Sequence, residues 1–456
     1  MRFLALLIAG CTAIHAGSSA EEAGPTEGLR LAVFDIDVTP PIGTELAYDK
    51  AESHWDLGLR AKGVVLLGAG DPIVLCAIDW IGVANEAYAA FRDALAEAAG
   101  TAVERVAFHA LHQHDAPASD FTTEAILEEF GHEPAQYDGA FAREVIDRLA
   151  AAVEDSLADA EPVTHLGVGE AEVHEVASNR RILGEDGTVR AMRYTATRDP
   201  ELRAEPEGVI DPMLSLVGFW NEDEPVAALT YYAVHPQSYY RTGVPNPDFP
   251  GVARFLRQLA APQALHVHFT GAGGNLGAGK YNDGSPENRL ILAERLADAM
   301  ARAWDAAARV PITPEDVDWR VEPVSLPLGA HLSADAYETV LAEGEPEGEV
   351  IASARKLAWL RRVEAGERID VSCLHIGPAS VLHLPAEAFV EYQLAARDML
   401  PERTVAVAAY GEYGPGYIGT AEAFEEGGYE TSDRATNVSP EVEDVLMDAI
   451  AAVLSP

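Results

Sequence analysis

The sequence predicts an α/β fold: a single large layered domain in which mixed β-sheets are flanked by helices. Short apolar segments typical of strands alternate with helical segments along the chain. The 456 residues suffice for one large domain or two to three ordinary ones. No internal repeat or low-complexity linker follows the Gly/Glu-rich segment 21–28. We therefore expect one domain over residues 29–456.

Strands are expected where short apolar runs stand between turn residues. The run 74–80 is almost continuously apolar, which is typical of a strand buried on both faces. Two further runs flank the polar turn 221–224. The expected strands are 31–38, 63–67, 74–80, 103–111, 163–176, 214–220, 226–234, 265–269, 370–375 and 380–384.

Helices are expected at five places. Asn85 is expected to cap an Ala-rich helix over 85–99, which Gly100 ends. Ser285 is expected to cap a long helix over 286–308 that has Pro286 at its first position. The other expected helices are 140–157, 333–343 and 349–364.

The charge balance excludes a general nucleic-acid-binding role. The chain has 74 acidic and 32 basic side chains and a formal net charge of −42. Binding phosphates requires clustered Lys and Arg, which this composition does not favour. Only four of the basic residues are lysines, and an acid-rich, Lys-poor composition suits a soluble protein in salty surroundings.

The N-terminus resembles a secretory signal over residues 1–20. Arg2 precedes a short apolar run, and Ser18-Ser19-Ala20 forms a cleavage site of small residues. The expected location is therefore secreted or periplasmic. An alternative interpretation takes Ile8-Ala9-Gly10-Cys11 as a lipobox, in which case lipidated Cys11 anchors the protein to the outer face of a membrane. No later apolar run is long enough to predict a transmembrane helix.

Several common catalytic and metal-binding signatures are missing. The sequence contains no GxSxG, HExxH or P-loop motif, which disfavours serine hydrolases, zincins and P-loop nucleotide hydrolases. Without a CxxC pair, a thiolate zinc site is excluded. Cys76 and Cys373 are expected to be two buried thiols, although spacing alone does not settle whether they pair.

The first candidate site is the segment His109 to His114. If it continues the preceding strand, His112 and His114 face the same side, because side chains alternate along a strand. Two imidazoles at the end of a strand suit a metal ligand beside an acid/base partner. The competing interpretation, hydrogen-bonded histidines on a loop, has about equal weight from this motif alone.

His235 is the second candidate, because it ends an apolar strand and precedes Pro236, which stops the strand. His268 belongs to a similar HxH pair, and the sequence leaves open whether it joins the site or fills the core. The glycine-rich loop 271–277 superficially resembles a dinucleotide motif. The next helix begins too late for that role, so we expect the loop to bring backbone close to a site.

Oxygen-bearing candidates lie late in the chain. Glu387 follows an apolar strand and a proline, a position suited to a metal ligand. Tyr417 and Tyr429 stand among glycines, where backbone can approach a ligand closely. Taken singly, Glu387 is equally consistent with an ordinary surface glutamate, and each tyrosine is equally consistent with a half-buried aromatic side chain.

Taken in order, these segments resemble the neutral, non-lysosomal ceramidase family in a short form that contains the N-terminal catalytic domain alone. The resemblance covers about residues 29–432. The matching segments are Asp35-Ile36-Asp37-Val38-Thr39-Pro40-Pro41-Ile42-Gly43, Ala77-Ile78-Asp79, the HxH segment, Ser178-Asn179-Arg180, Val234-His235-Pro236, the loop 271–275, Pro385-Ala386-Glu387 and the pair Tyr417 and Tyr429.

The resemblance implies a zinc-dependent amidohydrolase that cleaves the N-acyl bond of ceramide or a related lipid amide. It implies one zinc per chain and no protein nucleophile, because zinc acidifies water and polarises a carbonyl. The implied zinc ligands are His112, His235, Glu387 and Tyr417. The implied catalytic residues are His114, for proton transfer or charge stabilisation, and Arg180 with Tyr429, for the oxyanion.

The sequence also departs from the family. Leu111, Gln113 and Asp115 replace the usual Thr and Ser around the HxH pair, and Asp115 is placed to orient or re-tune His114. Ala386 replaces a glycine. The chain ends 27 residues after Tyr429, so the C-terminal β-sandwich of full-length ceramidases is expected to be absent.

Two other functions stay open from sequence: a metal-dependent hydrolase of an ester, phosphoester or other amide, and a non-catalytic protein that binds lipid or carbohydrate with the same fold. One zinc per chain would argue against the non-catalytic binding protein. A preference for amides over esters would argue against a hydrolase of esters or phosphoesters. The sequence carries no signal of oligomeric state.

Overall fold

Three β-sheets form the framework of the protein, which the computed structural model describes for residues 28–455. The first sheet has the order β5 (Val106–Ala110), β3 (Ile73–Ile78), β2 (Arg60–Leu67), β1 (Arg30–Asp37) and β7 (Glu161–Pro162). The second has the order β14 (Leu265–Thr270), β13 (Glu224–Tyr232), β12 (Met213–Asn221), β8 (His165–Glu172) and β16 (Ala308–Pro311). The third has the order β17 (Val317–Val324), β18 (Ile369–Ile376), β19 (Ala379–His383) and β21 (Thr404–Ala408).

The inner faces of the three sheets share one apolar core, which explains why their strands are apolar on both sides. Each sheet contributes alternate residues to this core, and the residues between them face the helices outside. Fully buried members of the shared core include Leu66 and Leu75 from the first sheet, Val217 and Leu229 from the second, and Val381 and Ala406 from the third.

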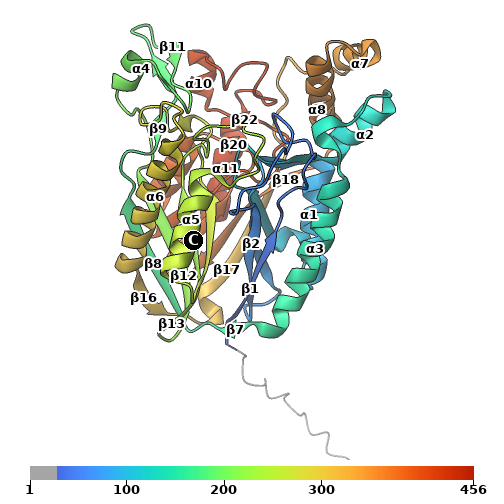
Figure 1. Ribbon diagram of the computed structural model, residues 1–456. Coiled ribbons are helices and arrows are strands. Elements are labelled where there is room, and N and C mark those ends of the chain that lie inside the picture. The colour runs from blue at the N-terminus through green and yellow to red at the C-terminus, as the bar shows by residue number, and fades with distance from the viewer. Residues whose placement is uncertain (1–27, 456) are drawn as a thin grey trace, which may run out of the picture.

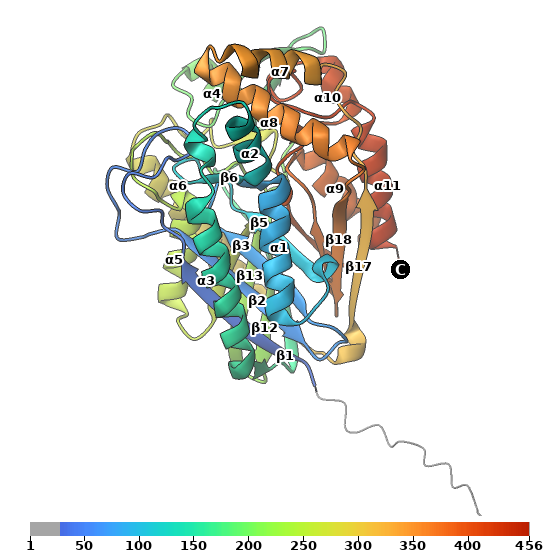
Figure 2. The same ribbon diagram turned by 90° about the vertical axis from the view of Figure 1, so that its right-hand side faces the viewer.

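Helices cover the outer faces of the sheets (Figures 1 and 2). The first sheet is covered by α1 (Asn85–Ala99) and α3 (Ala140–Ser156), and the second by α5 (Asp248–Ala260) and α6 (Glu287–Ala306). The third carries α11 (Val442–Leu454) and α9 (Val390–Met399). The expected α/β fold, with mixed sheets flanked by helices, is confirmed.

Shorter elements gather at one end of the sheets, at the top of Figure 1. Four two-stranded pairs lie there or nearby: β4 (Gly82–Ala84) with β6 (Ala118–Asp120), β9 (Ser178–Asn179) with β15 (Leu276–Gly277), β10 (Arg181–Leu183) with β11 (Val189–Met192), and β20 (Glu387–Ala388) with β22 (Tyr417–Ile418). The remaining helices are α2 (Phe121–Glu129), α4 (Pro200–Ala204), α7 (Ala334–Glu343), α8 (Glu347–Glu364) and α10 (Ala421–Glu426).

The three sheets meet through their edge strands β5, β14 and β21. Each of these strands runs parallel to its one neighbour, β3, β13 or β19. The backbone N–H of Ala110 donates to Tyr410 O at 2.9 Å, and that of Ala409 donates to Thr270 O at 2.8 Å. Unpaired edge groups are thereby satisfied, and the carboxyl ends of all three parallel pairs come together.

The region 308–324 passes from one sheet to another. Strand β16 pairs with β8 in the second sheet, and β17 pairs with β18 in the third. Because both sheets contribute to the shared core, the prolines here mark a connection, as expected for one domain. The structure describes no helix long and apolar enough to cross a bilayer. The expected signal segment and Cys11 lie outside the described residues.

Both predicted helix caps at α1 and α6 are wrong. The α1 cap is Ala84, and the backbone N–H of Asn85 donates instead to the Glu412 carboxylate at 2.8 Å, so a distant residue satisfies the helix end. At α6 the cap is Pro286, without a side-chain hydrogen bond. The predicted strand 103–111 begins with a 3₁₀ turn over Val103–Arg105, and 163–176 is a strand only over β8.

Two buried features tie the framework together. Arg254 of α5 makes a bidentate pair with Asp79, which follows β3, with N–O distances of 2.8 and 2.6 Å. This pair joins the first sheet to the helix that covers the second. Cys76 and Cys373 are both free and buried, as the sequence analysis favoured.

His268 belongs to the protein core. It lies on β14, is 1 % exposed, and its Nδ1 is 2.9 Å from the Thr230 hydroxyl on the neighbouring strand. Burial, assisted by the charge of Arg254, lowers the pKa of His268 to about 3. The imidazole is therefore neutral in the folded protein throughout the physiological range.

We predict that His268 makes the protein less stable in mild acid. The unfolded chain binds a proton here below about pH 6.5 while the folded chain does not, so stability is lost as pH falls through that value toward 3. Replacing His268 with Gln should remove about 2 kcal/mol of the difference in unfolding free energy between pH 7 and pH 5. Urea denaturation followed by circular dichroism measures this. An unchanged difference, equal to that of a variant at exposed His174, would contradict the assignment.

Candidate metal centre

The candidate centre lies where the carboxyl ends of the parallel strands meet. β5 leads to His112 and His114, β13 leads to His235, and β19 leads to Glu387. In α/β proteins this end of the strands is where ligands bind. Residues from three distant parts of the sequence are thus brought to one place by the junction of the sheets.

His112 and His114 converge because of a loop, and the expected strand alternation is wrong. Strand β5 ends at Ala110, and His112 has a φ of 71°, in the left-handed region. The His112 Nδ1 donates to the backbone carbonyl of Ile81 at 2.5 Å. A carbonyl only accepts, so Nε2 of His112 presents its lone pair to the centre.

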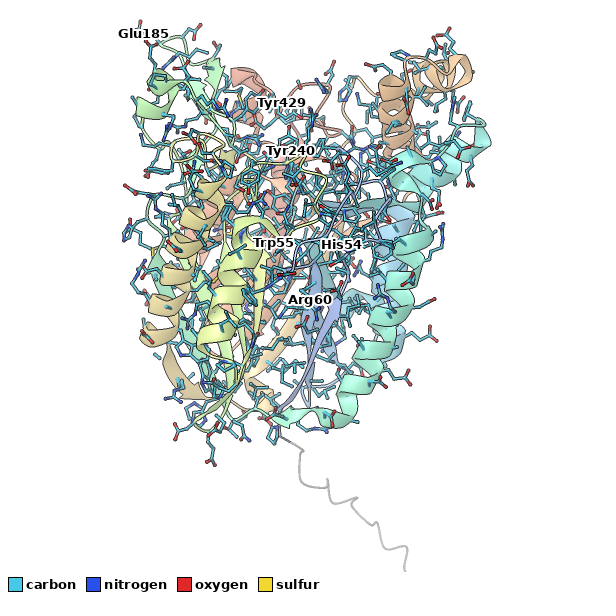
Figure 3. The ribbon with its side chains drawn as sticks, in the orientation of Figure 1. His54, Trp55, Arg60, Glu185, Tyr240 and Tyr429 are labelled. Carbon is cyan, nitrogen blue, oxygen red and sulfur yellow. The ribbon has the colours of Figure 1, made fainter. Side chains whose placement is uncertain are left out.

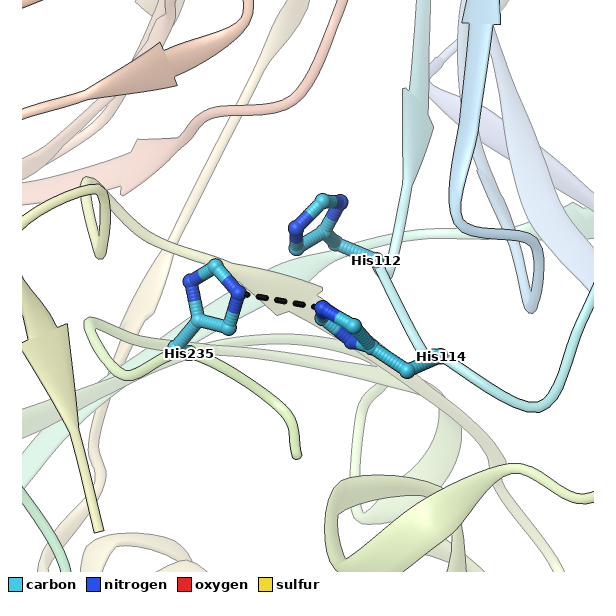
Figure 4. Close-up of side chains that lie close together, drawn as sticks. All are labelled: His112, His114 and His235. Atoms are coloured by element: carbon cyan, nitrogen blue, oxygen red, sulfur yellow. Dashed lines mark hydrogen bonds between the residues drawn. The ribbon is translucent and has the colours of Figure 1, made fainter. Parts of the chain in front are cut away.

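Three buried imidazoles form a cluster at this point (Figure 4). One nitrogen from each of His112, His114 and His235 lies within 4.8 Å of the other two. Nε2 of His235 is 3.3 Å from Nε2 of His114. All three side chains are at most 5 % exposed, so the cluster is shielded from bulk solvent.

Glu387 completes the arrangement. Its Oε2 is 3.4 Å from Nε2 of His112 and 3.8 Å from Nδ1 of His235. Its other oxygen, Oε1, accepts a hydrogen bond from the Tyr413 hydroxyl at 2.6 Å. Within the described structure, Oε2 of Glu387 and Nδ1 of His235 are buried without a hydrogen-bond partner. Two orphaned ligand atoms thus face each other next to the lone pair of His112.

These atoms fit a divalent metal ion. With metal–ligand bonds of about 2.0–2.1 Å, neighbouring ligand atoms stand roughly 3–3.5 Å apart, comparable to the 3.4 and 3.8 Å found here. Two imidazoles and a carboxylate are donors that zinc accepts, among other transition metals. A shared cation would also supply the missing partner of the two orphaned atoms. The buried histidine cluster can therefore bind a metal.

The surroundings of the centre favour the protonation states that its side chains need to bind a metal. Burial, and then the neighbouring His112, lower the pKa of both His114 and His235 well below the ordinary value. Burial tends to raise the pKa of Glu387, but His112, Tyr413 and Arg180 outweigh it, and the net shift is downward. Neutral imidazoles and an ionised carboxylate are the protonation states that bind metal.

Arg180 and Tyr417 form an adjoining group. The guanidinium of Arg180 donates to the Tyr417 hydroxyl at 3.2 Å and to Oε1 of Glu430 at 2.7 and 3.0 Å. Tyr417 lies directly opposite Glu387 in the β20–β22 pair. The rings of Tyr417 and Tyr429 meet edge to face at 5.7 Å. The structure thus brings together the predicted oxygen ligand and both predicted oxyanion residues, and their roles remain predictions.

Glycines allow the close packing of this region. A Cβ on Gly274 would stand 2.2 Å from the backbone oxygen of Glu387, and one on Gly273 would stand 2.9 Å from Val234. The loop 271–277 therefore does bring backbone against the site, as expected. Asp115 does not reach toward His114: its carboxylate accepts hydrogen bonds from the loop at Arg241, Thr242 and Asn246.

Sequence reasoning missed two tyrosines. Tyr413 bonds to Glu387, and the Tyr410 ring stacks on His112 with centroids 4.5 Å apart. Both follow strand β21, which the sequence analysis also missed. The aromatic run after the apolar segment 404–408 is the signal that could have found them.

The rim of the centre is aromatic. Tyr48 stacks on His114 with ring centroids 5.7 Å apart and planes 1° apart, and Tyr240 packs against both rings. Tyr48 and Tyr240 are among the large apolar side chains that remain exposed. Tyr240 and Tyr429 lie at the end of the molecule that carries the short elements (Figure 3). His114 is therefore the cluster member that lies beneath these exposed rings.

No family model matches the chain, and no curated protein matches it. Among solved structures, neutral ceramidase from Pseudomonas aeruginosa matches with a TM-score of 0.68 and 17 % identity, over 94 % of this chain and 74 % of that one. A ceramidase complexed with C2 matches with a TM-score of 0.68 and 16 % identity, over 94 % and 75 % of the two chains. The chain therefore has the fold of neutral ceramidase.

Proposed function

We propose that the protein is a zinc-dependent amidohydrolase that cleaves the N-acyl amide bond of ceramide or a related lipid amide. One observation carries the proposal: the imidazoles of His112 and His235 face one unpartnered oxygen of Glu387 at 3.4 and 3.8 Å. The shared fold with neutral ceramidase supports the choice of reaction. We further propose that the protein acts outside the cytoplasm, delivered by its N-terminal segment.

In this proposal His112, His235 and Glu387 hold one zinc per chain, and Tyr417 is its fourth ligand. Zinc supplies Lewis-acid chemistry and acidifies water when it is bound. The carbonyl of Ile81 fixes the tautomer of His112, and the Tyr413 hydroxyl fixes the direction of Glu387. These contacts hold the ligands in place before any ion arrives.

His114 is the proposed acid/base group. Its lowered pKa keeps the imidazole neutral at pH 7, and its Nδ1 has no hydrogen-bond partner within the described structure. When Nδ1 of His235 binds the metal, its Nε2–H faces Nε2 of His114 at 3.3 Å, so neutral His114 carries its hydrogen on Nδ1 and can donate it to the charge that develops on the substrate or to the leaving amine nitrogen. Arg180 and Tyr429 stabilise the negative charge that develops on the amide oxygen.

We predict that His112→Ala and His235→Ala each lose the metal and the activity together. Elemental analysis of the purified protein should give about one zinc per chain, and each variant should fall well below that value, since a ligand is removed. His174→Ala, at a histidine that is largely exposed, is the control and should keep its zinc. Unchanged metal content in both ligand variants, with the circular dichroism spectrum preserved, would contradict the assignment.

The reaction class is tested with a fluorescent short-chain ceramide and its ester counterpart. We expect the amide to be hydrolysed, a chelator to abolish turnover, and zinc to restore it. The loss should exceed the roughly 10–100-fold that removal of an outer partner of a metal ligand costs. Ester hydrolysis without amide hydrolysis would favour a different metal hydrolase. A zinc-loaded protein that hydrolyses neither compound, nor any lipid amide with a different head group, would overturn the proposal.

A further inference from the structure

A small basic pocket lies beside the candidate metal centre. It has a volume of about 70 Å³ and is bounded by β4, β6, helix α8 and the segments 413–416 and 434–437. Three cationic side chains line it: Arg355, Lys356 and Arg434. Such a concentration of positive charge is unexpected in a chain with a net charge of −42 and only 32 basic residues.

Two of these cations, Arg355 and Arg434, belong to exposed residues and make no direct ion pair with any residue that the structure describes. Among the residues that the structure describes, no hydrogen bond or ion pair engages the guanidinium of Arg355 or of Arg434. The carboxylate that lines the same pocket, Asp120, is already occupied, because it accepts hydrogen bonds from Asn85 and from Thr122 and Thr123 at the start of α2. The negative charge of Asp120 offsets part of the charge of Arg355, but the three cations that line the pocket outnumber this one carboxylate, so the lining is positive on balance.

Two buried polar atoms in the lining also lack partners. The Ser119 hydroxyl and the Oδ1 atom of Asn85 are buried in side chains that are 3 % and 2 % exposed, and no described group bonds to either. An unpaired buried polar atom costs free energy, so such atoms usually indicate a missing ligand or water. The pocket thus offers an anion one hydroxyl donor and two guanidiniums, whereas the Asn85 oxygen only accepts hydrogen bonds and cannot bond to an anion.

The pocket shares a wall with the metal centre. Tyr413 lines the pocket with its ring and donates from its hydroxyl to Glu387. Burial, and then Glu387, raise the pKa of Tyr413, and Arg355 opposes that rise, which shows that the cation lies within electrostatic reach of the phenol. Arg434 acts on Tyr429 in the same direction. A group bound in the pocket therefore lies against the side chain that donates to Glu387.

We propose that this pocket binds an anionic group of the substrate, a carboxylate or a sulfonate carried on the amine side of the scissile amide. The proposal rests on the proposed amidohydrolase function and narrows its substrates to N-acyl amides with an anionic head group, such as N-acyl amino acids. Guanidinium groups recognise such anions through paired, charge-assisted hydrogen bonds. A neutral head group leaves both guanidiniums without a direct ion pair.

The test compares three amides with the same acyl chain: N-dodecanoylglycine, N-dodecanoyltaurine and N-dodecanoylethanolamine. We expect kcat/KM for an anionic amide to exceed that for the neutral ethanolamide by about tenfold or more. The glycine and taurine amides separate a carboxylate from a sulfonate preference. In Arg355→Gln/Arg434→Gln, KM for the preferred anionic amide should rise about tenfold while the neutral amide changes less than about twofold.

A matched control lies on the same helix. Arg361 of α8 pairs with Glu129 and Glu338 on the outer surface, so Arg361→Gln removes the same charge away from the pocket and should keep the preference. If amides are hydrolysed but the double variant loses activity on the anionic and neutral amides equally, or keeps the preference, the anion site is overturned and the proposed function stands.

If none of the amides is hydrolysed, the proposed function fails. A binding measurement then tests separately whether the pocket recognises an anion. Isothermal titration calorimetry then compares N-dodecanoylglycine with N-dodecanoylethanolamine on the zinc-loaded protein. Tighter binding of the glycine amide that disappears in the double variant, but not in Arg361→Gln, supports the pocket. Equal binding of the two amides overturns it.

Discussion

The meeting of three edge strands determines the rest of this structure. β5, β14 and β21 each end a sheet, and backbone hydrogen bonds join β5 and β14 to Ala409 and Tyr410, which directly follow β21. These bonds close the sheets around one core. Because each edge strand runs parallel to its neighbour, all the carboxyl ends face the same end of the molecule. Side chains separated by as many as 275 positions, from His112 to Glu387, therefore become neighbours.

Burial gives those neighbours their chemistry. In water a histidine near neutral pH is partly protonated, whereas here burial keeps His114 and His235 neutral and adjacent cationic and hydrogen-bonding groups keep Glu387 ionised. The hydrogen bond to Ile81 fixes the orientation of the His112 ring, and the hydrogen bond from Tyr413 fixes the orientation of the Glu387 carboxylate. The same phenol of Tyr413 separates the centre from the basic pocket, so one residue borders both the proposed reaction site and the proposed site of head-group recognition.

Local sequence signals were sufficient for much of the fold and for parts of the site. The apolar runs of β1, β3, β12 and β13 and the start of α1 with Gly100 at its end were predictable from periodicity and turn residues. Ordered motifs, compared with a known family, singled out His235 and Glu387. Local signals could not show hydrogen bonds between residues far apart in sequence. Glu412 accepts from the start of α1 in place of a capping side chain. The loop that turns His112 inward is held by hydrogen bonds to the carbonyls of Trp80 and Ile81. The sequence could not predict the cations of the pocket either. Arg355 and Arg434 stand 79 positions apart and share no motif.

The central claim is that one zinc ion joins His112, His235 and Glu387. It is tested most directly by anomalous X-ray diffraction from crystals of the purified protein, measured above and below the zinc absorption edge. The account predicts a single anomalous peak bounded by Nε2 of His112, Nδ1 of His235 and Oε2 of Glu387, present only above the edge. A map without a peak there, from protein that still hydrolyses its substrate, would contradict the account.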